Sequence, residues 1–182
     1  MSTKTQKTLA QLYANLPDNT SGSITEERVR DIVETLRNGH GEMTITSTAA
    51  TSFSDSTSYV ACAGTWTLSS NAHNWSMGTN GRLQYDGPED RVVHLACSFS
   101  MTSSNNNQTV YFRVGKNGTS ISESTINRKI GTGSDVGSSA LHVFFDVSNG
   151  DYLELMVRNS SWSSSETVTM EHVNFFVMDM AK

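Results

Sequence analysis

Strict alternation of apolar and polar residues along short segments restricts how this chain folds more than any other feature. Between residues 93 and 101 every odd position is apolar, and the positions between them include histidine and serine. Residues 110–114, 141–147 and 153–157 repeat the same period of two. That period is typical of a strand with one buried face. We therefore expect the chain from residue 42 onward to be all-β, and its length suits one domain of ordinary size.

Composition excludes several other classes of protein. Charged residues make up only 17%, while serine and threonine together fill 48 of the 182 positions. Such a composition can indicate disorder, but the long alternating runs and only 2 prolines argue against it. The net charge is −5, with no basic stripe, so we expect no nucleic-acid partner. No apolar run approaches the roughly 18 residues of a membrane span, and the N-terminus lacks the apolar core of a secretory signal. We therefore expect no membrane insertion and folding in a cytosol.

The first forty residues differ from the rest, and two short helices are predicted there. The second is expected to begin at Ser23, which with Glu26 matches a capping box. Both helices carry an apolar stripe that is too narrow to form a core alone. We assign residues 1–41 to a helical N-terminal arm and residues 42–182 to a β-sandwich head. The arm either packs on its own domain or docks on another protein, and its stripe consists of Leu9, Leu12, Tyr13, Leu16, Val29, Ile32 and Leu36.

Two segments near the C-terminus suggest how the strands pair. A two-residue loop at Asn149-Gly150 would set Val147 opposite Tyr152, whereas an odd-length loop sets it opposite Leu153. Because a hairpin must bury one apolar face, we expect the odd loop, with a bulge near Gly150. In residues 168–180, apolar side chains occupy both odd and even positions. This pattern predicts that both faces of the strand are buried. In a sandwich of this size another subunit often provides that cover.

The pattern of residues 141–157, with Gly150-Asp151 between two alternating segments, resembles the penultimate hairpin of jelly-roll domains in the tumour necrosis factor and complement-head family. Residues 81–85, 92–101 and 174–178 resemble the early strands and the last strand of that family. The resemblance implies a jelly-roll β-sandwich that forms a compact homotrimer with its last strand near the threefold axis. The residues it places in the trimer interface are Val173, Phe175, Phe176, Val177 and Met178.

A second resemblance concerns residues 12–33, which are similar to the start of many bacteriophage virion proteins, with the stretch Asn19-Thr-Ser-Gly-Ser-Ile-Thr25. In such proteins a short helical arm precedes a β-rich trimeric head. Together the two resemblances imply a capsid decoration or cement protein that docks on the virion, after assembly in the host cytoplasm, through a major capsid or tail protein. The alternative is a receptor-binding tail-fibre or spike module that recognises a host surface glycan.

Candidate residues for chemistry are sparse, so we expect no enzyme, no metal and no cofactor. His94 and Cys97 are three apart on one strand and therefore point to opposite faces, which prevents them from sharing a metal ion. Cys62 and Cys97 form either a disulfide or two buried thiols, and a reducing compartment favours thiols. Trp75 and Trp162 lie in Ser/Asn-rich segments and are the best candidates for glycan contact, with packing as the alternative.

Overall fold

The computed structural model describes residues 8, 11, 25–35, 37–132 and 135–180. Within these residues, helix α2 precedes a β-sandwich, and a 3-10 turn, η1 (Ser122–Ser124), precedes β10. The helix is α2 (Glu26–Thr35), and the strands are β1 (His40–Thr48), β2 (Ala50–Ser52), β3 (Val60–Ala61), β4 (Gly64–Leu68), β5 (Trp75–Thr79), β6 (Arg82–Tyr85), β7 (Arg91–Ser103), β8 (Gln108–Lys116), β9 (Thr119–Ser120), β10 (Ile126–Ile130), β11 (Gly137–Val147), β12 (Tyr152–Asn159) and β13 (Thr167–Met180).

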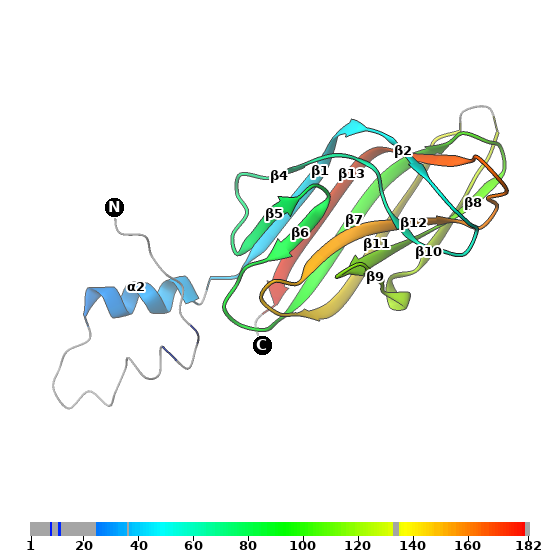
Figure 1. The fold of residues 1–182 in the computed structure, drawn as a ribbon. Helices are drawn as coiled ribbons and strands as arrows, with labels where there is room; N and C mark the ends of the chain where they lie inside the picture. The colour runs from blue at the N-terminus through cyan, green and yellow to red at the C-terminus, as the bar shows by residue number, and fades with distance from the viewer. Residues whose placement is uncertain (1–7, 9–10, 12–24, 36, 133–134, 181–182) are drawn as a thin grey trace.

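Two antiparallel sheets form the sandwich (Figure 1). Sheet A has the order β11-β7-β13-β1-β4, with β2 also paired to β13. Sheet B has the order β10-β8-β12-β6-β5, with β3 paired to β12 and β9 to β8. The chain passes repeatedly from one sheet to the other, so that sequence neighbours such as β6, β7 and β8 lie in alternating sheets. This double-sheet arrangement is the jelly roll, and it confirms the predicted fold class.

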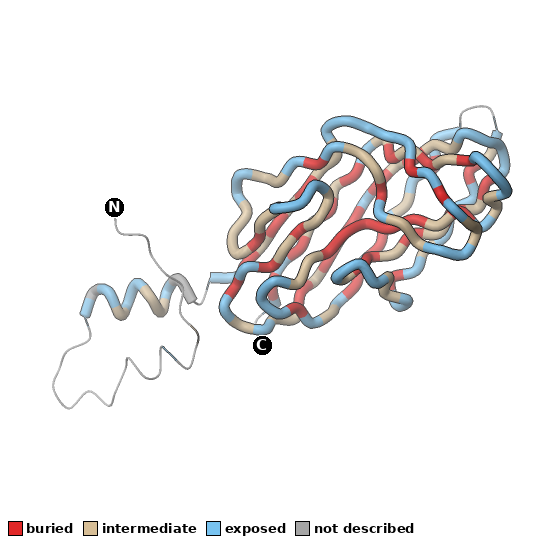
Figure 2. Tube along the Cα trace, in the orientation of Figure 1, coloured by how far each residue is buried: buried red, intermediate tan, exposed pale blue. Residues whose placement is uncertain are grey.

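The core lies between the two sheets, where the alternating apolar residues meet (Figure 2). The odd positions of β7 point inward, and Phe99 contacts Phe112 of the opposite sheet with ring centroids 4.5 Å apart. Most outward positions of the same strands carry polar side chains, with Val92 and Ala96 of β7 as apolar exceptions. The period-two pattern of residues 93–101 and 110–114 therefore correctly predicted which face of each strand is buried.

The predicted hairpin of residues 141–157 is wrong, because its two strands belong to different sheets. β11 pairs with β7 in sheet A, whereas β12 pairs with β8 and β6 in sheet B. The loop between them crosses from one sheet to the other. Gly150 takes a φ of 88° there, and the Asp151 carboxylate accepts the Ser148 N–H at 2.8 Å. The apolar faces of both strands are buried in the core, one contributed by each sheet rather than side by side in one sheet.

The N-terminal elements differ from the prediction at their boundaries. α2 begins at Glu26 rather than Ser23, and the Thr25 hydroxyl caps it by accepting the Arg28 N–H at 3.3 Å. β1 begins at His40, two residues before the expected start of the head. The predicted first helix and Ser23 lie outside the described residues, apart from Thr8 and Gln11.

Candidate functional site

The outer face of sheet A carries the side chains that alternate with the core residues. The strand register sets them in rows that cross the sheet from β11 through β7 and β13 to β1. Two neighbouring rows are Phe144–His94–Met178–His40 and His142–Ala96–Phe176–Glu42. Toward the C-terminal end of β13, Asp146, Val92 and Met180 form a further row. We call the apolar members of these rows the apolar half of the face: Val92, Ala96, Phe144, Phe176, Met178 and Met180.

The apolar half is open to solvent in the single chain. Phe144 is 61% exposed, Met178 37% and Met180 39%, although all three lie in regular strands. Isolated exposed apolar residues are ordinary on protein surfaces, but a contiguous group marks a surface that another molecule covers. The chain thus presents a flat apolar area on one side of the sandwich.

Two histidines hold the Phe144 ring in place within this area. Nε2 of His94 and Nδ1 of His142 are 3.2 Å apart, and the two rings stack with centroids 5.3 Å apart. The His94 ring also stacks on Phe144, at 4.7 Å between centroids. One ring nitrogen donates to the other in such a pair. The stack limits the rotamers open to Phe144 and presents its ring in a defined position before any partner arrives.

The other half of the same face is polar. A shallow depression of about 550 Å³ lies there, lined mainly by the hydroxyl, amide and imidazole side chains of Thr44, Ser98, Ser100, Ser138, His172 and Asn174. The outer face of sheet A is therefore divided into an apolar half, next to the point where the arm joins the sandwich, and a polar half at the far end.

The junction between the arm and the sandwich is a buried polar cluster around Asp179. The Asp179 carboxylate accepts the Gly39 N–H at 3.1 Å and the Trp75 indole N–H at 3.2 Å. The Asp179 N–H in turn donates to the Gly39 carbonyl at 2.8 Å. Burial raises the pKa of Asp179 above its usual value, against the lowering effect of these donors. The cluster fixes the chain just before β1 to the last strand of the sheet.

Helix α2 lies beside the sandwich rather than on it (Figures 1 and 2). Val29 is 48% exposed and Val33 64%, while Ile32 is half-buried. An amphipathic helix in a globular protein normally covers its apolar stripe with its own core. Here Val29 of the stripe and the neighbouring Val33 are not covered, which favours the docking interpretation of the arm over packing on its own domain.

Removing the Asp179 carboxylate is expected to destabilise the fold. In Asp179→Ala the Gly39 N–H and the Trp75 indole N–H lose their acceptor inside the protein, and each such loss costs about 1–3 kcal/mol. Urea unfolding should therefore show a free energy of unfolding lower by several kcal/mol. Asp86→Ala is the control, because Asp86 is exposed and accepts one hydrogen bond, from Gln84. An Asp179→Ala variant as stable as the control would contradict this role of the carboxylate.

The predicted trimer-interface set is corrected by the directions of the side chains on β13. Val173, Phe175 and Val177 point between the sheets and are almost fully buried in a single chain, so a second subunit cannot contact them. Phe176 and Met178 occupy the alternate positions of β13, which point outward, and they belong to the apolar half. Sequence reasoning missed Phe144 because residues 141–147 were assigned one inward face. The sequence does contain a sign of this exposed residue, because an apolar side chain stands at an outward position directly before Phe145.

The structure places the remaining predicted site residues in different environments. Of the predicted docking stripe, Leu9, Leu12, Tyr13, Leu16 and Leu36 lie outside the described residues. Trp75 is not a glycan contact, because it is only 4% exposed and its ring packs on Tyr85. Trp162 is half-buried against the core. Cys62 and Cys97 are two free buried thiols, and burial raises the pKa of both well above the usual value.

The described part of the chain contains no group of three or more His, Cys, Asp or Glu side chains placed to hold a metal ion. Among the same residues, no helix is both long and apolar enough to cross a membrane.

Comparison with known proteins finds similarity in structure alone. No protein-family model and no curated protein sequence matches the chain. Murine APRIL, in crystals at pH 5.0, is 11% identical, with a TM-score of 0.47 over 72% of this chain and 98% of that chain. Eiger TNF from S. frugiperda is 10% identical, with a TM-score of 0.49 over 80% of this chain and 94% of that chain.

Proposed function

We propose that this chain is a non-enzymatic structural protein: a homotrimeric head that decorates and stabilises a virus particle, attached to it by the N-terminal arm. The observation that carries the proposal is the pair of separate apolar surfaces on one small chain. The apolar half of sheet A supports contact between subunits, and the exposed valines of α2 support contact with something else.

The subunit contact is proposed on the apolar half because its shape suits a second copy of the same chain. The area lies on the face of a sheet and combines two phenylalanines and two methionines with few charges, which is the composition of an interface core. Three copies close into a ring through head-to-tail contacts, in which the apolar half of one copy meets a neighbouring surface of the next. The jelly-roll resemblance of the sequence implies three copies.

Attachment is proposed for the arm because α2 leaves Val29 and Val33 open while Asp179 fixes the base of the arm. A rigid base with an uncovered helix suits a docking segment. Three arms on one trimer bind a symmetric particle together, so modest contacts by each arm add up to firm attachment through avidity. The similarity of residues 12–33 to the start of bacteriophage virion proteins supports a capsid or tail protein as the partner.

Counting the copies of this chain in purified particles tests the proposal. Quantitative mass spectrometry against the major capsid protein is expected to give hundreds of copies for each particle, because a decoration protein covers a repeating shell. Tens of copies or fewer would place the chain on the tail instead. Absence from particles that contain every other structural protein would overturn the proposal. The glycan-binding alternative is less well supported, because one of its two candidate contacts, Trp75, is buried and the other, Trp162, is half-buried.

A further inference from the structure

A cluster of two arginines and two tyrosines lies on the outer face of sheet B. Tyr111 pairs with Arg158 in the β8–β12 ladder, and Tyr59 directly precedes β3, whose Val60 pairs with Val157. The guanidinium carbon of Arg158 lies 4.4 Å from the ring centroid of Tyr111 and 5.2 Å from that of Tyr59. Arg113 approaches the same Tyr59 ring at 4.5 Å. Two cations thus share one aromatic ring.

Arg158 has no anionic partner in the described part of the chain, and no hydrogen bond there satisfies its guanidinium. Arg82 provides a comparison on the same sheet. It stacks on Tyr152 at 4.4 Å, as Arg158 does on Tyr111, but its Nε also donates to the Glu154 carboxylate at 3.3 Å. Among the described residues, Arg82 is therefore paired with an acid, whereas Arg158 is not.

The surroundings of Arg158 are short of negative charge and of hydrogen-bond partners. Arg113 donates to the hydroxyls of Thr125 and Ser120, at 2.8 Å and 3.3 Å, rather than to a carboxylate. Glu154, on the same strand as Arg158, is bound by Arg82, and the exposed Glu123 of η1 interacts electrostatically with Arg113 rather than with Arg158. Among the described residues, two buried polar atoms of the cluster, Nε of Arg158 and the Tyr59 hydroxyl oxygen, have no hydrogen-bond partner. Buried polar atoms are nearly always satisfied, so the polar groups of this cluster are incompletely paired in the single chain.

We propose that Arg158, Arg113, Tyr59 and Tyr111 form a binding site for an oxyanion such as a carboxylate or a sulfate. The terminal nitrogens of Arg158 form the planar fork that such groups bind through two parallel hydrogen bonds. The tyrosine rings hold the guanidinium in place, which lowers the entropic cost of binding. Both a free anion and an acidic substituent on a sugar offer this chemistry.

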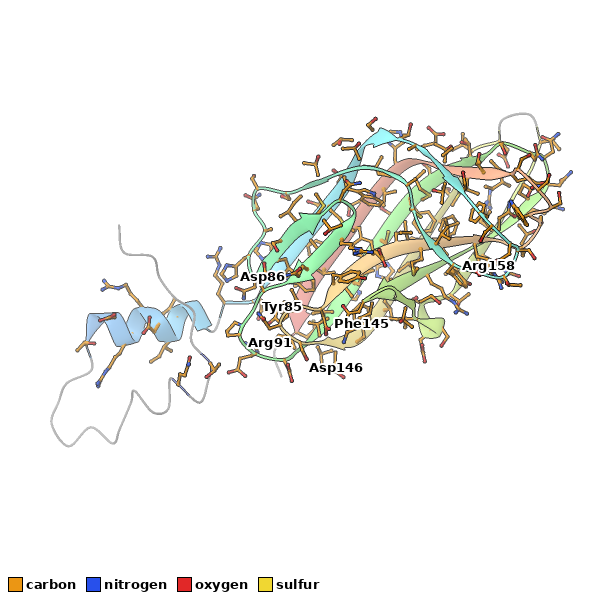
Figure 3. The ribbon with its side chains drawn as sticks, viewed as in Figure 1. Tyr85, Asp86, Arg91, Phe145, Asp146 and Arg158 are labelled. Atoms are coloured by element: carbon orange, nitrogen blue, oxygen red, sulfur yellow. The ribbon has the colours of Figure 1, made fainter. Side chains whose placement is uncertain are left out.

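The site is compatible with the subunit contact proposed above and is independent of it. It lies on sheet B, whereas the apolar half lies on the outer face of sheet A. Arg158 is at the end of the sandwich far from the arm, opposite Tyr85 and Arg91 (Figure 3). An oxyanion ligand would therefore be held on the side of the head that faces away from both proposed contacts.

Titration of the full chain with four probes, followed by amide NMR, tests the site. Sulfate, acetate and glucuronate are expected to shift the amides of Tyr111 and Arg158, while neutral glucose shifts neither. Arg158→Met should weaken oxyanion binding by at least about tenfold, because hydrogen bonds to a charged group are lost. Arg128→Met is the matched control, since Arg128 is an exposed arginine on β10, and its affinity should stay within about twofold of the unmodified chain.

Arg158→Lys keeps the positive charge but lacks the planar guanidinium that binds an oxyanion through two hydrogen bonds. This variant therefore tests the site if Arg158→Met does not fold. A clear loss of affinity in Arg158→Lys supports the site. Glucuronate binding more tightly than acetate identifies a sugar-borne group, and equal affinities identify a free anion; both results support the proposal. Amides that no anion shifts, or an Arg158→Lys variant that binds as well as the unmodified chain, would overturn it.

Discussion

Replacing Phe144 with aspartate is expected to convert the proposed trimer into a folded monomer. Phe144 is the most exposed aromatic side chain of the apolar half, and the stack on His94 holds its ring in position. Burying such a ring contributes about 1.5–3 kcal/mol, and aspartate would instead place an unpaired carboxylate in an apolar contact. Symmetry repeats the change at each of the three contacts. Light scattering after size-exclusion chromatography should therefore report the mass of one chain.

The fold itself should survive this change, because Phe144 points away from the core. Circular dichroism and thermal unfolding at low chain concentration check that point. Thr79→Asp is the control: it adds the same charge at an exposed position of β5 in sheet B, and it should remain trimeric. A Phe144→Asp variant that stays trimeric would move the subunit contact away from the apolar half.

Removing residues 1–37 is expected to abolish attachment to particles while leaving the trimer intact. The deletion stops before Gly39, because Gly39 exchanges hydrogen bonds with Asp179 and belongs to the folded head. Attachment is measured by sedimentation of added protein with particles that lack it. Because three arms act together, losing all of them should reduce occupancy far more than any single substitution does.

A finer variant tests the helix stripe without deleting the arm. Val29→Ser combined with Val33→Ser removes exposed apolar area from α2 and adds no charge, so attachment should weaken strongly. Val29→Ile combined with Val33→Ile keeps that surface apolar and should attach normally. Full occupancy by the serine variant or by the deleted chain would contradict docking through the arm.

The sequence predicts the two-layer architecture well wherever alternation is long. Residues 93–101 carry five inward apolar positions in succession, so β7 and its buried face follow from the pattern alone. β1 was not predicted, since Met43 and Ile45 are its only large apolar residues and its outer part is polar. Periodicity also leaves open which sheet a strand joins, which is why residues 141–157 were interpreted as a hairpin although β11 and β12 belong to different sheets.

The site was harder to predict than the fold, because it depends on contacts between distant segments. Trp75 lies in a Ser/Asn-rich segment that is typical of an exposed loop, yet its indole N–H reaches Asp179, 104 residues away. Phe144, His94 and His142 come together only when β11 pairs with β7. Likewise, Arg158 meets Tyr59 only through the pairing of β3 with β12.

The molar mass of the unmodified chain in solution tests the central claim most directly. Light scattering over a wide range of concentrations is expected to give three times the chain mass of 19.9 kDa, with no other species at high concentration. The apolar half is then buried between subunits, and Phe144 is protected from solvent. A species of 19.9 kDa at every concentration, with Phe144 still open to solvent, would contradict the proposed trimer.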